Sequence, residues 1–253
     1  MVNFIANTVL NKIIICNMKT VLITGAGRGL GLEIAKQELH KGSFVIATYR
    51  TFSEDLSILE SKYGDHVKII RMDINDSNSV AVASSEVGKI VDRIDIIYNN
   101  AGVLNKGHKN IFKNIIFDDS VLDIVNTNSF GFLRVIQGFY NFIKQNTMII
   151  VISSGAGSIK SAIRNNYDIS SVNIPYYISK AGLNIGACLL KHDLKKIGAD
   201  ILLIDPGRIK TDMGGKNAFV DINDSVKNIL LFSHKEIKPK SIFIDFNGNE
   251  IEL

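Results

Sequence analysis

The sequence predicts one doubly wound α/β domain in three layers, with a seven-stranded parallel sheet between two layers of helices. From Met18 onward, short β-rich apolar runs alternate with longer amphipathic stretches, which is typical of repeated strand, helix, strand units. No internal repeat and no Pro/Ser-rich linker divides the chain. A length of 253 residues is also common for a single domain of this class.

The expected strands are short apolar runs rich in β-branched residues. They span 20–24, 44–49, 67–72, 94–98, 147–152, 200–204 and 241–245. The expected helices carry apolar residues at three- and four-residue spacing, and they span 29–41, 53–62, 76–89, 120–145, 175–197 and 222–233. Because crossovers between parallel strands are right-handed, these helices should cover both faces of the sheet. Ligands of such sheets bind beyond the carboxyl ends of the strands.

The composition argues against several classes of protein. The chain is 46% hydrophobic and 21% charged, with 3 prolines, which does not suggest disorder. Its net charge of +4 is mild, and Lys and Arg are scattered among nearly as many Asp and Glu, so we expect no nucleic-acid partner. Neither a Cys-x-x-Cys nor a His-x-x-x-His spacing occurs, so we expect no metal. Two cysteines without ligand spacing favour a reducing cytoplasm.

Residues 1–17 are apolar but are interrupted by Asn3, Asn7, Asn11 and Lys12. A membrane-spanning helix needs about 20 apolar residues, and a signal peptide begins with a basic region. We therefore expect no membrane association. We interpret the segment as an extension, an added strand or the product of a mis-set translational start, ahead of one domain over 18–253.

A glycine-rich turn follows the first predicted strand. The run TGAGRGLG covers Thr24 to Gly31 and places glycines at 25, 29 and 31 before a helix. Such glycines permit a tight turn, close approach of the backbone to a pyrophosphate and close helix-to-strand contact, while the helix N-terminus offers free N–H groups. A glycine pattern alone is also typical of an ordinary turn. Its place between strand and helix favours a dinucleotide site.

Five ordered motifs resemble those of the short-chain dehydrogenase/reductase family. They are TGAGRGLG, NNAG at 99–102, SSGAGS at 153–158, YYISK at 176–180 and DPGRIKTDMGG at 205–215. The last motif and the run FLRVIQ most resemble the C-factor/sniffer type of carbonyl reductase. The resemblance implies a Rossmann fold and hydride transfer between a nicotinamide and a ketone, an aldehyde or a secondary alcohol.

The resemblance also implies a set of cofactor-binding residues. They are Gly25, Arg28, Gly29, Leu30, Gly31, Arg50, Asp73, Ile74, Asn100, Ala101, Gly102, Tyr176, Lys180, Pro206, Gly207, Ile209 and Thr211. The second strand ends in Tyr49 and Arg50 rather than in an acidic residue for the ribose hydroxyls of NAD. With Arg28, this favours NADP(H) over NAD(H), since a guanidinium pairs well with a phosphate. Two alternatives stay open: Arg50 as a solvated strand-end residue, and Asp73 as a helix cap.

Tyr176 and Lys180 stand four positions apart on a predicted helix, so their side chains share one face. This arrangement suits acid/base chemistry: Tyr176 would protonate a carbonyl oxygen in reduction and take the alcohol proton in oxidation. Lys180 is expected to lower the pKa of the phenol and to bind the nicotinamide ribose. Tyr177 lacks the four-residue offset and is expected to pack or to line the substrate pocket.

Ser154 and Asn128 complete the tetrad that the resemblance implies. Ser154 would hydrogen-bond the substrate oxygen, with Ser153 as its alternative. Asn128 lies on an apolar helix stripe and begins an Asn-x-x-Gly motif, in which the asparagine carbonyl holds a water of a proton relay; Asn126 is the rival.

Two segments are expected to shape the substrate pocket. Ser154 and Tyr176 stand 22 positions apart, which is longer than the common family interval. The intervening run IKSAIRNNYDISSVNI is therefore expected to form part of the pocket. Residues 212–219, with the glycine pair at 214 and 215, are expected to form a lid.

These predictions point to an enzyme acting on a small molecule. Members of the family commonly pair through the helices that match 120–145 and 175–197 here, so the resemblance allows a homodimer or homotetramer, although monomeric members also exist. The alternative is a regulatory protein that binds NADP with weak catalysis, because a fold does not determine a function. Retention of the whole tetrad favours the enzyme.

Overall fold

The computed structural model describes residues 18–104, 119–165, 172–211, 213–215 and 218–253. Within these ranges, seven strands form one sheet in the order β3-β2-β1-β4-β5-β6-β7. The strands are β1 (Thr20–Ile23), β2 (Phe44–Tyr49), β3 (Val67–Arg71), β4 (Ile94–Asn99), β5 (Ile143–Ile152), β6 (Asp200–Asp205) and β7 (Phe243–Asp245). Every pairing of neighbouring strands is parallel. The predicted fold class is confirmed.

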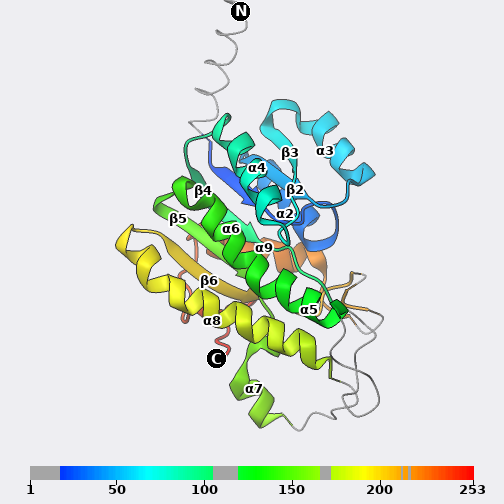
Figure 1. Ribbon diagram of the computed structural model, residues 1–253, viewed down its shortest axis with the longest axis vertical. Helices are drawn as coiled ribbons and strands as arrows, with labels where there is room; N and C mark the ends of the chain where they lie inside the picture. Colours follow the sequence, from blue (N-terminus) through cyan, green and yellow to red (C-terminus); the bar gives the residue numbers. More distant parts are fainter. Residues whose placement is uncertain (1–17, 105–118, 166–171, 212, 216–217) are drawn as a thin grey trace, which may run out of the picture.

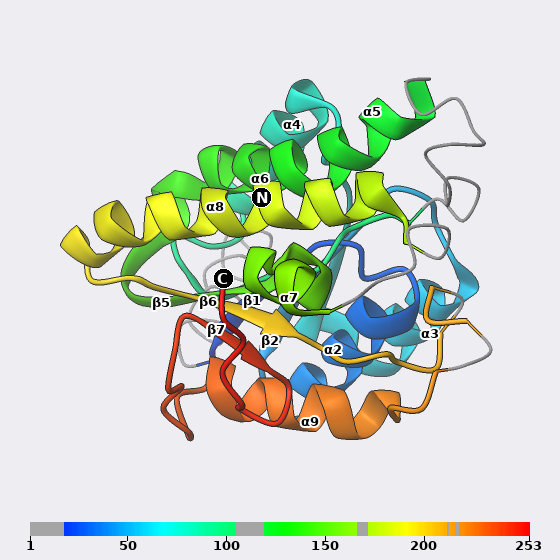
Figure 2. The same cartoon turned by 90° about the horizontal axis from the view of Figure 1, so that it is seen from below.

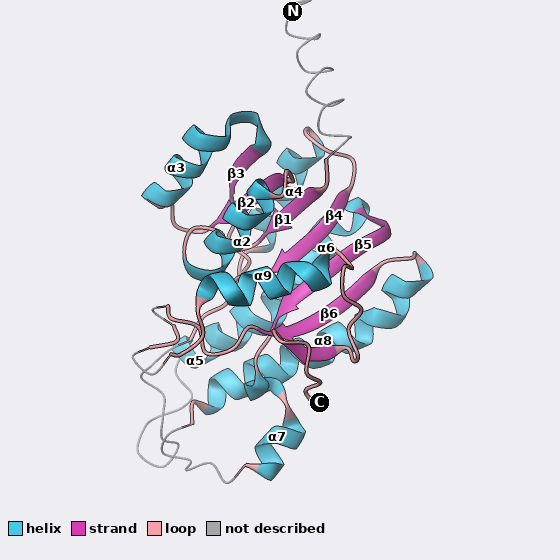
Figure 3. Cartoon of the chain, turned by 180° about the vertical axis from the view of Figure 1, so that it is seen from behind, coloured by secondary structure: helices cyan, strands magenta, loops and turns pink. Residues whose placement is uncertain are grey.

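Helices cover both faces of the sheet (Figures 1 and 2). One face carries α4 (Ser77–Gly88), α5 (Asp119–Val125), α6 (Gly131–Phe139) and α8 (Ile174–Lys196). The other face carries α2 (Gly29–His40), α3 (Glu54–Tyr63) and α9 (Ile222–Ser233), which lie in front of the sheet in Figure 3. The short α7 (Ile159–Arg164) lies near the C-terminus of the chain. None of the helices in these ranges is long and apolar enough to cross a bilayer.

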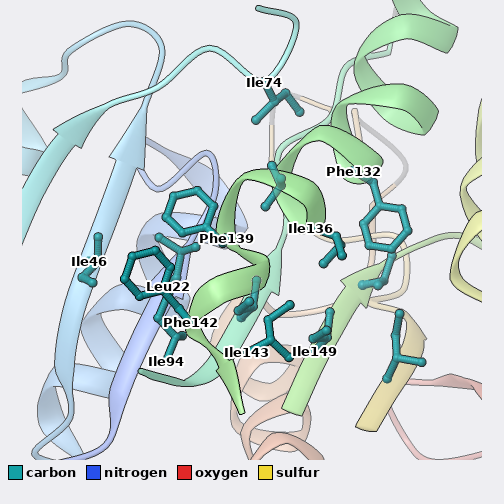
Figure 4. Packing of buried hydrophobic residues seen from close by; sticks show 14 of the residues in the cluster. Leu22, Ile46, Ile74, Ile94, Phe132, Ile136, Phe139, Phe142, Ile143 and Ile149 are labelled. Carbon is teal, nitrogen blue, oxygen red and sulfur yellow. The ribbon is translucent and has the colours of Figure 1, made fainter. Parts of the chain in front are cut away.

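The core consists of two apolar clusters, one on each face of the sheet. Successive strand residues point to opposite faces, so Leu22 and Ile149 join the cluster under α6 and α8, while Ile23 and Ile150 join the cluster under α2 and α9. Figure 4 shows part of the first cluster. All four of these side chains are fully buried. Burial on both faces explains why these strands are continuously apolar rather than alternating.

The single predicted helix over 120–145 is wrong in part. The chain instead forms α5, a π-helical turn η2 (Asn126–Phe130), α6 and a 3₁₀ turn η3 (Tyr140–Phe142), and β5 begins at Ile143. The pairing of β4 with β5 shifts register after Ile143, and Asn146 adopts a positive φ of 71°. Such a bulge lets the strand start four residues earlier than its apolar run suggests. The other predicted elements agree within two residues, and α7 was not predicted.

Candidate active site

The glycine turn between β1 and α2 is closed by Asn100 from the end of β4. The Asn100 Nδ2 donates to the carbonyl oxygens of Thr24 at 2.8 Å and Gly25 at 3.2 Å. A Cβ at Gly31 would lie 2.4 Å from both the Asn100 Nδ2 and the Gly25 oxygen, and Gly25 has a φ of +69°. Only glycine fits at these two positions. The bare backbone at the N-terminus of α2 therefore fits the pyrophosphate of a dinucleotide.

Thr24 is a site residue that the sequence analysis did not single out. Its Oγ1 accepts hydrogen bonds from the backbone N–H groups of Asn100 at 3.0 Å and Ala101 at 2.9 Å. The hydroxyl thus fixes the NNAG turn onto the glycine turn. The only sequence signal was a buried polar residue at the end of an apolar strand.

Arg28 and Arg50 are both exposed at the carboxyl edge of the sheet. Arg28 is the N-cap residue of α2, and Arg50 directly follows β2. The Thr211 Cγ2 would lie 3.8 Å from a Cβ at Gly29. The glycine turn and the segment after β6 therefore face each other.

Asp73 does not cap the following helix. Its carboxylate accepts from the backbone N–H of Asn75 at 2.9 Å, whereas Asp76 is the N-cap of α4 and accepts from Asn78. The alternative of Asp73 as a helix cap is therefore wrong. Ile74, the next residue, is buried against Gly131.

The segment after β6 is held against α9 and the C-terminal residues. The Ser225 hydroxyl donates to the Pro206 carbonyl at 2.8 Å, and Ile209 pairs with Val220 in an isolated bridge. Gly207 has a φ of +79°, and a Cβ there would lie 2.9 Å from Phe246 and from Val220. In the predicted lid, residues 212, 216 and 217 lie outside the described part of the chain, so the lid stays a prediction.

Ser154, Tyr176 and Lys180 come together between β5 and α8. The Asn173 side chain accepts from the backbone N–H of Tyr176 at 3.1 Å and so caps α8. The Lys180 Nζ lies 5.8 Å from the centroid of the Tyr176 ring, and the Ser154 hydroxyl hydrogen-bonds the phenol. Ser153 is buried and donates instead to the Asn184 Oδ1 at 2.5 Å. The geometry thus favours Ser154 over Ser153.

Asn184 is a second residue that the sequence analysis did not single out. Besides accepting from Ser153, it donates to the Gly157 carbonyl at 3.1 Å. A Cβ at Gly157 would lie 2.5 Å from the Asn184 Nδ2. Asn184 therefore fixes the turn that carries Ser154 against α8.

Asn128 lies in the π-helical turn and is buried. Its side chain exchanges two hydrogen bonds with the backbone of Val103, at 2.8 and 2.9 Å, and donates to the Ser179 Oγ at 2.9 Å. A Cβ at Gly102 would lie 3.1 Å from its Oδ1. The rival Asn126 accepts from Arg134 at 2.7 Å instead. Asn128 thus joins the loop after β4 to α8, and π-turns of this kind recur at functional sites.

Burial dominates the titration of the central pair. It raises the pKa of Tyr176 to about 12, against the hydrogen bond from Ser154, and the charge of Asp205 and the neighbouring Tyr177 raise it further. Burial lowers the pKa of Lys180 to about 8, against the opposing effect of Asp205. In this arrangement the Lys180 Nζ donates to the Ile152 carbonyl at 2.8 Å, and the expectation that Lys180 lowers the phenol pKa stays a prediction. The phenol is held in its proton-donating form.

Residues 19–219 match the sequence model of a family described as short chain dehydrogenase. The chain belongs to the short-chain dehydrogenase/reductase family. An uncharacterised oxidoreductase of Schizosaccharomyces pombe is 30% identical over 228 residues, which cover 88% of this chain and 86% of the relative. This confirms the family resemblance of the five motifs.

Solved structures of short-chain dehydrogenases/reductases share the fold. The NADPH-bound carbonyl reductase from chicken fatty liver superposes with a TM-score of 0.81 at 26% identity, covering 93% of this chain and 99% of that one. The carbonyl reductase Sniffer of D. melanogaster gives a TM-score of 0.82 at 22% identity, covering 93% and 100%. The predicted likeness to carbonyl reductases is confirmed. Among the described residues, no group of three or more His, Cys, Asp or Glu is suited to a metal.

Proposed function

We propose that the protein is an NADP(H)-dependent oxidoreductase of the carbonyl reductase type, with Tyr176 as its general acid and base. The observation that carries the proposal is the convergence of Ser154, Tyr176 and Lys180 at the carboxyl edge of the sheet. The glycine turn that fits a dinucleotide lies at the same edge. We therefore expect acid/base chemistry and cofactor binding to meet at this edge of the sheet.

Each residue of the tetrad has a part in the proposed reaction. When bound, a reduced nicotinamide supplies hydride to the carbonyl carbon. Tyr176 donates its phenolic proton to the carbonyl oxygen, and Ser154 hydrogen-bonds that oxygen and steadies the phenol. The Lys180 ammonium stabilises the phenolate that forms and binds the nicotinamide ribose, while Asn128 holds α8 in place. In alcohol oxidation the same groups act in reverse.

The cofactor preference is proposed from the charges beside the glycine turn. Arg28 and Arg50 lie beside the glycine turn at the carboxyl edge of the sheet, where we expect the adenosine ribose to bind, and β2 does not end in an acidic residue. These groups suit a 2′-phosphate, and the chicken carbonyl reductase is bound to NADPH. Arg50→Asp is expected to weaken NADPH binding more than NADH binding, which fluorescence titration with both nucleotides would measure.

The central test mixes the protein with NADPH and a panel of ketones and aldehydes while the NADPH absorbance is followed. Tyr176→Phe is expected to lower turnover by about 100- to 10,000-fold, the usual size of a lost general acid. NADPH binding should be retained. Tyr140→Phe, which removes the hydroxyl of an exposed tyrosine in η3, is the matched control and should keep its activity. Tight NADPH binding without turnover of any carbonyl by the parent protein would instead support the regulatory function.

A further inference from the structure

Asp205 ends β6 and holds two active-site loops at once. Its Oδ2 accepts from the backbone N–H of Gly155 at 2.6 Å, and its Oδ1 accepts from that of Gly207 at 2.7 Å. Gly155 directly follows Ser154, and Gly207 belongs to the segment expected to hold the nicotinamide. One carboxylate therefore fixes the distance between the substrate-binding serine and the cofactor-binding loop.

The Asp205 charge also acts on both groups of the acid/base pair. It opposes loss of the proton from the Tyr176 phenol, and it favours the charged form of the Lys180 amine. Among the described residues, Tyr177 on the same helix also raises the pKa of the phenol, and the Lys180 Nζ lies 5.8 Å from the centroid of the Tyr176 ring. In the neighbouring strand, Asp245 stands opposite Asp205, but its carboxylate accepts hydrogen bonds from Asn247 and Asn249 of its own turn.

We propose that Asp205 is a positioning residue that bridges the loops after β5 and β6 and extends carbonyl reduction to higher pH. The inference rests on the proposed function and adds a residue to it. Reduction requires a protonated phenol and a charged ammonium, and a nearby carboxylate favours both states.

The proton balance explains why this charge matters. In reduction, the hydride and its electron pair pass from the reduced nicotinamide to the carbonyl carbon, and the π electrons of the C=O bond take the Tyr176 proton. The carbonyl is reduced to an alcohol and the nicotinamide is oxidised. The phenolate must then regain a proton before the next turnover. A carboxylate that raises the affinity of the phenol for its proton keeps this step favourable in alkaline solution.

The test compares the pH dependence of NADPH-driven reduction in the parent, Asp205→Asn and Asp205→Glu. The asparagine keeps the size of the side chain but removes its charge, so the alkaline limit should move to lower pH. At the pH where the parent retains half of its activity, the variant is expected to retain about a tenth, as for a change of one pKa unit. Asp205→Glu should restore the alkaline limit, even with a lower maximal rate.

Asp245→Asn is the matched control, because it removes the same charge at the end of the adjacent strand and should leave the alkaline limit in place. A uniform loss of rate in Asp205→Asn, with an unchanged pH profile, would show that the carboxylate only bridges the loops. Thermal melting of each variant establishes that it is folded.

A second measurement needs no substrate. The phenolate absorbance of Tyr176 is followed against pH as the difference between each protein and its Tyr176→Phe derivative. Asp205→Asn should form the phenolate at lower pH than the parent. If the phenolate of Asp205→Asn formed at lower pH but no carbonyl were turned over by the parent, the role of Asp205 would be supported and the proposed function would be rejected. An unshifted phenolate in an active enzyme would overturn the inference alone.

Discussion

Lys180 is a residue whose charge the folded protein disfavours. Burial lowers its pKa from 10.5 to about 8, so between these values the unfolded chain binds a proton that the folded chain does not. The penalty is fully present below pH 8 and disappears as the pH rises toward 10.5. At most it amounts to about 3 kcal/mol. A residue that we propose to act in catalysis therefore reduces the stability of the fold.

Lys180→Met is accordingly expected to stabilise the protein at neutral pH. The substitution removes the penalty but leaves the Ile152 carbonyl without its donor, which costs about 1–2 kcal/mol. The net gain in the free energy of unfolding should be about 1–2 kcal/mol. Denaturant unfolding across pH would measure it, with the exposed Lys191→Met as control. A gain that persists above pH 10.5 would contradict the explanation.

At the residue scale, the sequence located the proposed reacting groups but not their environment. The four-residue offset placed Tyr176 and Lys180 on one helix face, because that spacing is fixed by helix geometry. Their pKa values follow from burial and from Asp205, which is distant in sequence. Thr24 and Asn184 escaped notice for the same reason: their roles are hydrogen bonds to segments that only the fold brings near.

The turn between β1 and α2 is the element on which the proposed cofactor binding depends. In Gly31→Ala the new methyl group would lie 2.4 Å from the Gly25 oxygen and from the Asn100 Nδ2, so the turn must open. Forced overpacking of this kind costs about 1–3 kcal/mol, which corresponds to NADPH binding weaker by about 5- to 150-fold. Isothermal titration would measure it.

Gly88→Ala provides the comparison for that experiment. Gly88 is the last residue of α4, and a Cβ there would lie at an ordinary 3.5 Å from Phe142. This variant should bind NADPH like the parent. If Gly31→Ala bound NADPH as tightly, the glycine turn would not be the pyrophosphate site.

At the element scale, apolar runs and turn motifs were sufficient for six strands and most helices. The prediction of elements fails between Asn126 and Thr147, where a π-turn and a strand bulge interrupt the regular helix and strand geometry. Both irregularities are stabilised by tertiary contacts, such as the Asn128 bonds to Val103 and the Thr147 bond to the Ile94 carbonyl. Local periodicity contains no sign of such contacts.

At the scale of the whole molecule, an exposed apolar row predicts self-association. Ile178, Ile185 and Leu189 of α8 are 57%, 59% and 71% exposed, and α8 lies beside α5 and α6 on the outer face (Figure 2). Contiguous apolar surface of this kind marks interfaces. We expect a homodimer or homotetramer that Leu189→Glu dissociates, as measured by light scattering. Ile163→Glu, on the equally exposed α7, should leave the assembly intact; a monomeric parent would refute the interpretation.

A buried polar cluster joins four parts of the fold. Glu38 of α2 is fully buried and accepts from the Tyr98 hydroxyl at 2.6 Å, from Ser43 at 2.6 Å and from the His234 Nε2 at 2.9 Å. Lys19 lies 3.0 Å from the other ring nitrogen of His234. Burial by itself would raise the pKa of Glu38, but these partners hold it below its ordinary value of 4.5. The cluster therefore favours the ionised carboxylate.

The lowered pKa of Glu38 predicts how the stability of the whole molecule depends on pH. Because the folded pKa of Glu38 is depressed, its contribution is present above pH 4.5 and is lost as the pH falls through the folded value. Glu38→Gln should lower the free energy of unfolding by about 3 kcal/mol at neutral pH, since it leaves buried donors with a weaker acceptor. The difference from the parent should shrink in acid, whereas the surface variant Glu33→Gln should change stability by less than about 0.5 kcal/mol throughout. Denaturant unfolding from neutral to acid pH would measure both differences. If the loss in free energy of unfolding caused by Glu38→Gln stayed constant over this range, the shape of the cluster rather than its charge would be stabilising.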